Sequence, residues 1–302
     1  MQVDFLKNNP YHIDACLWIG DVGITGINAV AEILAGTVNP SGSLVDTYLY
    51  NNFSSPAMVN NIPTVYTNYA EGLIPKNAST YMIYQEGIYV GYKYYETRYE
   101  DFVMGTGNAG NYAYGNDVAF PFGYGLSYTD FEYSNMKMQY DVATTTYTFE
   151  VTVTNTGDVA GKEVVQIYVS SPYTQYDVEN KVEKASVSLV GFEKTDILAP
   201  GASETLTILV DGDDVASYDA YGAGTYILDA GDYYFTAATD AHDAVNNVLA
   251  AKGYTPANTA NRMDAAGKKD LVATWNNPAL DTTTYAVSDN GTVIKNQLSD
   301  SD

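Results

Sequence analysis

The tyrosine-rich segment around Glu86 places a carboxyl group, which can donate or accept a proton, among aromatic and apolar residues. Tyr84, Ile88 and Tyr89 place aromatic and apolar side chains near the Glu86 carboxyl, and Gly87 lets the backbone turn closely there. Burial in such surroundings raises the pKa of a carboxyl and keeps it protonated near neutral pH, as a proton donor requires. The alternative is an ordinary surface carboxylate at the start of a strand, as most glutamates are.

Other polar groups carry weaker signals. Glu96, Glu100 and Asp101 are close in sequence, but nothing marks one of them as a nucleophile. We interpret them as a solvated face with Arg98 as an ion-pair partner. Residues 211–215 (DGDDV) begin like a calcium loop but place valine where a fifth-position oxygen ligand is needed, so we predict a β-turn. One cysteine and two histidines are too few for a structural zinc site, and we expect neither a metal nor a cofactor.

Composition narrows the classes of partner. The 302 residues are enough for about two domains, and 46% hydrophobic with 17% charged residues is typical of a globular protein. A net charge of −23 would repel both phosphate backbones and anionic lipid headgroups. We therefore expect no nucleic-acid and no membrane partner. The compartment stays open, because the N-terminus shows no signal peptide and no apolar run reaches 18 residues.

The elements that precede and follow Glu86 differ in their periodicity. Residues 15–19 (ACLWI) are a short apolar run that predicts a buried strand, and apolar residues three or four apart over 24–34 predict a helix. This unit is typical of an α/β layer. From about residue 131 the pattern alternates, as in 147–154 (YTFEVTVT), with one apolar and one polar face.

Further strands are predicted after this alternating segment. They cover 164–169, 204–210, and a hairpin of 225–228 with 232–237. The sequence thus predicts an α/β fragment followed by an all-β antiparallel sandwich of the fibronectin type III or immunoglobulin-like kind. We interpret 241–302 as an extended connector in which residues 241–252 could form a short helix.

Three stretches, in this order, resemble glycoside hydrolase family 3, the β-glucosidase-like group. They are 18–48, with its NPSG turn; YQEGIYVGYKYYE at 84–96 with FPFGYGLSY at 120–128; and 151–172 with 189–210. Three ordered matches are far more specific than one motif. The resemblance implies the C-terminal part of the family's α/β sandwich domain at 1–130, a fibronectin type III-like domain at 131–240 and the connector at 241–302.

The resemblance also implies a reaction and its residues. Retaining glycoside hydrolysis needs two carboxyl groups about 5–5.5 Å apart, a nucleophile and an acid/base. Glu86 matches the family's acid/base, and Tyr84 and Tyr92 beside it are the candidates for contact with a sugar. The sequence departs from the family at 43–46 (SLVD) and at Lys93, but neither departure touches the glutamate.

The second carboxyl is expected elsewhere. The family's nucleophile is an aspartate on a barrel, and no stretch here repeats the strand–helix pattern of a barrel. We therefore expect the chain to depend on a barrel that it lacks, one that follows it in a reversed domain order. It would then be part of a retaining β-glycosidase acting on an oligosaccharide or β-glycoside, and inactive alone. The alternative is a non-catalytic module that binds a carbohydrate or a protein.

Overall fold

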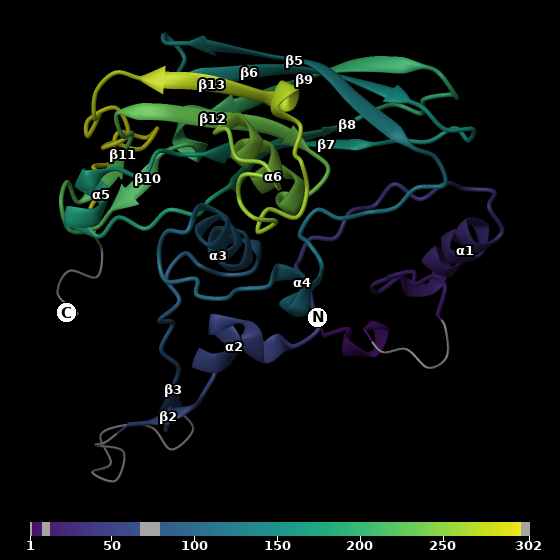
Figure 1. Cartoon of the computed structure of the whole chain (residues 1–302), viewed down its shortest axis with the longest axis horizontal. Helices are drawn as coiled ribbons and strands as arrows, with labels where there is room; N and C mark the ends of the chain where they lie inside the picture. The colour runs from purple at the N-terminus through teal and green to yellow at the C-terminus, as the bar shows by residue number, and fades with distance from the viewer. Residues whose placement is uncertain (1, 8–12, 67–78, 297–302) are drawn as a thin grey trace.

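The largest part of the molecule is an antiparallel β-sandwich (Figure 1). The computed structural model describes residues 2–7, 13–66 and 79–296. One sheet has the strand order β5-β6-β9 and the other β13-β12-β7-β8, with every pairing antiparallel. The strands are β5 (Phe131–Asp141), β6 (Thr146–Asn155), β7 (Val164–Ser170), β8 (Ser188–Lys194), β9 (Ser203–Asp211), β12 (Gly231–Ala238) and β13 (Val272–Asn277).

Strand β6 shows why this part of the chain folds as a sandwich. Its alternation places Tyr147, Phe149, Val151 and Val153 on one fully buried face, as the sequence predicts. These side chains pack against apolar residues of the opposite sheet, for example Phe235. Burial of each large apolar side chain contributes roughly 1.5–3 kcal/mol, so this face holds the two sheets together.

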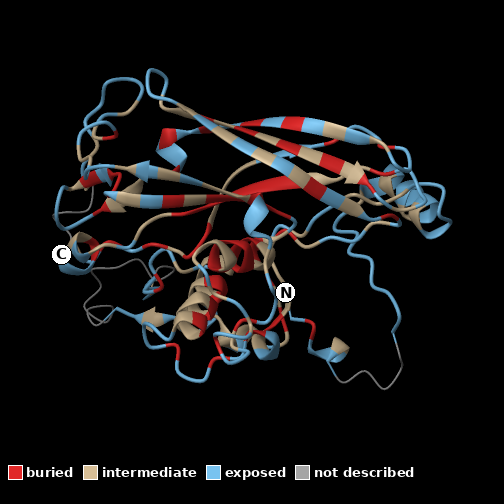
Figure 2. Ribbon diagram, turned by 45° about the horizontal axis from the view of Figure 1, so that its top comes forward, coloured by how far each residue is buried: buried red, intermediate tan, exposed pale blue. Residues whose placement is uncertain are grey.

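Strand β7 is buried on both faces, because helices cover the side turned away from the sandwich core. Val165, Ile167 and Val169 point into that core, whereas Tyr168 belongs to a second apolar cluster. This second cluster is formed mainly by α3 (Tyr92–Met104) and α6 (Ala241–Ala251), which lie against the four-stranded sheet in Figures 1 and 2. The helix that follows Glu86 is thereby anchored to the sandwich.

The prediction of an extended connector at 241–302 is wrong for residues 272–277, which form β13, while the short helix that it allowed at 241–252 is present as α6. Residues 241–251 form α6, whose apolar face is buried, and β13 pairs with β12 along its length. The predicted hairpin is also wrong. β11 (Thr225–Ile227) pairs with β10 (Ser217–Asp219), while β12 turns away to pair with β7 and β13.

The N-terminal part contains short elements and one longer helix. Residues 24–34 lie in α1 (Gly23–Leu34), as predicted, but no residue of this helix is buried. The strand predicted at 15–19 is wrong, because no described strand pairs with this exposed stretch. The remaining elements are η1 (Asp4–Leu6), β1 (Tyr48–Leu49), η2 (Asn52–Ser54), α2 (Pro56–Asn60), β2 (Thr64–Val65), β3 (Thr80–Tyr81), α4 (Tyr114–Asp117), β4 (Val118–Phe120), α5 (Gln175–Asn180), η4 (Gly212–Asp214) and η5 (Lys269–Leu271).

Strands β1 and β4 form a two-stranded antiparallel sheet, as do β2 and β3. Among the described residues no helix is long and apolar enough to cross a membrane. In the same described part of the chain, no group of three or more histidine, cysteine or acidic side chains could hold a metal ion. Residues 212–214 of the rejected calcium loop form the single turn η4.

Candidate functional site

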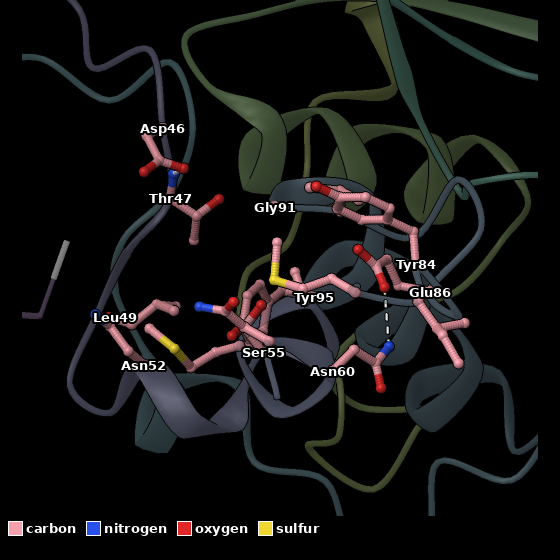
Figure 3. A pocket seen from close by; sticks show the side chains of 16 residues that line it. Asp46, Thr47, Leu49, Asn52, Ser55, Asn60, Tyr84, Glu86, Gly91 and Tyr95 are labelled. Atoms are coloured by element: carbon pink, nitrogen blue, oxygen red, sulfur yellow. Dashed lines mark hydrogen bonds between the residues drawn. The ribbon is translucent and has the colours of Figure 1, made fainter. Parts of the chain in front are cut away.

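Glu86 lies in a tight turn directly before α3 (Figure 3). Gly87 and Gly91 follow it with φ angles of 57° and 56°, a left-handed backbone region that favours glycine. The Tyr89 N–H donates to the Glu86 carbonyl at 3.0 Å and closes the turn. The Glu86 side chain accepts a hydrogen bond of 2.8 Å from the Asn60 amide, at the end of α2.

The pKa of Glu86 is lowered in the structure, whereas the sequence-based expectation is a raised pKa. The hydrogen bond from Asn60 lowers the pKa of Glu86, backbone hydrogen bonds at Glu86 and Gln85 lower it further, and burial only partly opposes them. Donors that stabilise the charged form have this effect on any carboxyl. The expected apolar surroundings are missing, because Tyr84 is 78% exposed and Ile88 is 38% exposed. In this chain Glu86 is therefore a carboxylate at neutral pH.

Glu86 borders a cavity of about 440 Å³. Residues 46–61 line one part of it and residues 82–95 the other, so the cavity lies outside the β-sandwich. In Figure 3, Glu86 and Tyr84 lie at one end, and Asp46 lies at the other. Asp46 accepts the Thr47 N–H at 2.8 Å. The lining combines these carboxylates, amides and hydroxyls with a larger number of apolar and aromatic side chains, a mixture that is common in ligand pockets.

The two predicted sugar contacts fall in different places. Tyr84 lines the cavity, beside Glu86. Tyr92 is not among the lining residues. Its ring stacks on Phe122 with the ring centres 4.7 Å apart, and its hydroxyl accepts the Leu189 N–H at 3.0 Å. Burial raises the pKa of Tyr92. The structure thus brings Tyr84 to Glu86, whereas Tyr92, the first residue of α3, packs against Phe122 and β8.

The prediction of a solvated acidic face is wrong for Glu96, whose side chain is 0% exposed. It accepts 2.5 Å and 2.8 Å hydrogen bonds from the Tyr114 hydroxyl and His242 Nδ1, and His242 Nε2 lies 3.0 Å from Asp264. Burial alone would lower the pKa of His242, but these two carboxylates raise it to about 10. The imidazolium in turn outweighs burial and lowers the pKa of Asp264 to about 2. This cluster joins α3 to α6.

Glu100 and Arg98 also differ from the predicted solvated face with its ion pair. Glu100 forms an ion pair with Lys252 at 2.8 Å, and its side chain is 15% exposed. The Arg98 guanidinium lies over the Tyr112 ring, 4.5 Å from its centre, and donates to the Tyr94 hydroxyl. The acidic residues of α3 that sequence reasoning assigned to solvent thus include two that tie this helix to α6.

Sequence reasoning missed Asn60, which donates to Glu86 from 26 residues upstream. Pro56 at the first position of α2 is the one local signal, because proline favours the start of a helix. That signal locates the short helix, but it does not say which later residue approaches Glu86. The pairing joins the end of α2 to the turn before α3, and no local pattern reports such a contact.

Comparison with known proteins adds independent information on this chain. The model of the fibronectin type III-like domain matches residues 163–241. A β-glucosidase of Ruminococcus albus is 37% identical over 235 residues, which is 76% of this chain and 21% of that protein. β-Glucosidase A of Butyrivibrio fibrisolvens is 36% identical over 255 residues, which is 79% of this chain and 26% of that protein. The chain therefore spans about a fifth to a quarter of the length of these relatives.

Solved structures of β-glucosidases are also similar to this chain. β-Glucosidase 3B of Thermotoga neapolitana, in complex with α-D-glucose, is 28% identical with a TM-score of 0.57, over 85% of this chain and 27% of that one. The GH3 β-glucosidase of Bifidobacterium adolescentis is 25% identical with a TM-score of 0.58, over 87% of this chain and 30% of that one. Because 85% and 87% of this chain are covered, the similarity extends beyond the β-sandwich.

Proposed function

Over its matched residues the chain belongs to glycoside hydrolase family 3, and from this premise we propose that it provides the general acid/base of a retaining β-glycosidase. The proposed acid/base is Glu86, and Tyr84 contacts the sugar at the same end of the cavity. The substrate is an oligosaccharide or another β-glycoside. The nucleophile is an aspartate on a barrel domain of the same enzyme, which this chain does not include.

The observation that carries this proposal is the placement of Glu86. Its carboxylate is held by Asn60 and by a glycine-bounded turn, yet it borders a cavity whose walls combine polar and apolar side chains. A catalytic carboxylate needs both a fixed position and room for a ligand. The walls come from residues 46–95, so the alternative, recognition of a ligand by the sandwich alone, gains no support from this cavity.

The pKa of Glu86 must rise for it to act as a proton donor. In this chain the Asn60 hydrogen bond lowers it. A barrel with a nucleophilic carboxylate, together with a bound sugar, would add a like charge and exclude water, and both effects raise the pKa of a carboxyl. We therefore propose that the barrel raises the pKa of Glu86 and also supplies the rest of the sugar-binding pocket.

The domain boundaries form part of the same proposal. Residues 1–130 would be the C-terminal part of the family's α/β sandwich domain and 131–240 the fibronectin type III-like domain. Helix α1 supports this division, because it leaves Ile24 and Leu34 97% and 73% exposed. Such apolar faces are typical of surfaces that another part of a protein covers.

Substitution of Glu86 in the full-length enzyme tests the proposal. Glu86→Ala should lower the turnover of a β-glucoside by roughly 100-fold to 10,000-fold, because it removes the proton transfer. Azide should restore part of the turnover, since a small nucleophile can attack the glycosyl-enzyme without a general base. Glu179→Ala, on the exposed face of α5, is the matched control. Unchanged turnover in Glu86→Ala would refute the assignment.

A further inference from the structure

The turn that carries Glu86 is held from outside by a side chain of the β-sandwich. Glu183, between α5 and β8, accepts the Ile88 N–H through its Oε2 at 3.3 Å. The same carboxylate lies directly against Gly87, where an added Cβ would overlap with both of its oxygens. The positive φ angle of Gly87 favours glycine here, and the absence of a side chain lets the Glu183 carboxylate approach the backbone closely.

The contact belongs to a continuous series between two parts of the chain. The 183–189 segment, which leads into β8, touches residues 88–97 at four hydrogen bonds. Beyond the Glu183 contact, the Tyr89 hydroxyl donates to the Lys184 carbonyl at 3.2 Å, and the Ser186 N–H donates to the Thr97 hydroxyl at 2.9 Å. The Leu189 N–H donates to the Tyr92 hydroxyl at 3.0 Å. These four hydrogen bonds therefore fix the Glu86 turn and the first turns of α3 relative to the 183–189 segment.

The 183–189 segment is itself fixed by a buried ion cluster. The Lys184 side chain is 4% exposed, and its ammonium lies 2.8 Å from the Asp177 carboxylate and in contact with the Asp229 carboxylate. It also donates to the Pro172 carbonyl at 2.9 Å. Asp177 and Asp229 are 0% and 1% exposed. Three donors on the ammonium thus meet three acceptors, which fixes the backbone of Lys184 next to Glu183, whose own side chain is exposed.

We infer that Glu183 is a positioning residue for Glu86, through which the fibronectin type III-like domain sets the location of the acid/base. This inference rests on the proposed function of Glu86. Glu183 does not line the cavity, so it acts on the turn and not on the sugar. Its loss would free the turn and shift the Glu86 carboxyl, and small misplacements of a catalytic group are costly.

Two variants and one control test the inference. Glu183→Ala removes the acceptor, Glu183→Gln keeps an oxygen at the same place, and Glu179→Ala removes a nearby exposed carboxylate. In the 302-residue chain, amide hydrogen exchange of residues 86–90 reports on the turn without any activity. We expect at least tenfold faster exchange of the Ile88 amide in Glu183→Ala, with Glu183→Gln and the control close to the unaltered chain. The exchange of β6 should be unchanged in all of them.

The full-length enzyme then connects the turn to catalysis. Glu183→Ala should lower kcat by about tenfold to a hundredfold with little change in KM, and Glu183→Gln should recover most of that loss. Faster exchange at Ile88 with unchanged kcat would overturn the positioning role. Unchanged exchange would overturn the contact itself. Because exchange needs no catalysis, a failure of the acid/base assignment appears separately, as full turnover in Glu86→Ala.

Discussion

Glu86 and Glu96 lie ten residues apart on either side of the start of α3, and their surroundings are opposite. Glu96 is completely buried, and Tyr114 and His242 occupy its two oxygens. Glu86 is 9% exposed, receives its side-chain hydrogen bond from Asn60 and borders a cavity. A carboxylate whose oxygens are all used by the protein stabilises the fold. A carboxylate held on one side and open on the other can serve a ligand.

The contrast also separates two uses of charge. At Glu96 the protein places an imidazolium between two carboxylates, and the charges satisfy each other inside the molecule. At Glu86 the donor is a neutral amide, which orients the carboxylate without cancelling its charge. The first arrangement joins two helices, and the second leaves a charge available to a substrate.

The largest expected effect is on stability. Glu96→Ala leaves the His242 imidazolium with a single carboxylate and removes the acceptor of the buried Tyr114 hydroxyl. Loss of one partner of a buried ion pair costs about 3–5 kcal/mol. Urea unfolding of the 302-residue chain should show this loss for Glu96→Ala and a nearly unchanged midpoint for Glu86→Ala. Equal midpoints for the two variants would contradict the claim that Glu96 stabilises the fold and Glu86 does not.

The second effect concerns pH. The pKa of His242 is raised to about 10 in the folded chain, above its ordinary value of 6.5. The stabilisation is therefore complete below about pH 6.5 and is lost as the pH rises through 10. The difference in unfolding free energy between the unaltered chain and His242→Gln should shrink by a few kcal/mol from pH 6 to pH 10. A difference that is independent of pH would mean that His242 is neutral in the cluster.

A smaller effect distinguishes the two tyrosines. Tyr92→Phe keeps the ring stack on Phe122 but removes the acceptor of the Leu189 N–H. We expect a loss of about 1–2 kcal/mol of stability in the isolated chain. In the full-length enzyme KM should not change, whereas Tyr84→Ala should raise it. A raised KM for Tyr92→Phe without a loss of stability would restore Tyr92 as a sugar contact.

The sequence predicts features that are local and misses those that join distant segments. The alternation in β6 and the apolar spacing in α1 are periodic patterns, and both elements form. The burial of Glu96 depends on His242, which is 146 residues away. β13 belongs to a sheet, but nothing in its own composition indicates the partner strand β12. A short-range pattern cannot report such pairings.

The same limit explains the chemistry of the site. The resemblance to family 3 singles out Glu86 from the sequence, and Tyr84 lies beside it in the cavity. The predicted direction of the Glu86 pKa shift was wrong, because the exposed Tyr84 does not bury the carboxyl while Asn60 donates a hydrogen bond to it. Adjacent residues in a turn do not determine what surrounds a side chain.

The dependence of turnover on the leaving group tests the central claim most directly. A general acid matters most when the departing oxygen is a poor leaving group, because an acidic phenol departs without a proton. In the full-length enzyme, Glu86→Ala should therefore lower kcat/KM strongly for a phenyl β-glucoside and at least tenfold less for a dinitrophenyl β-glucoside. Equal losses for both substrates would contradict the assignment of Glu86 as the acid/base.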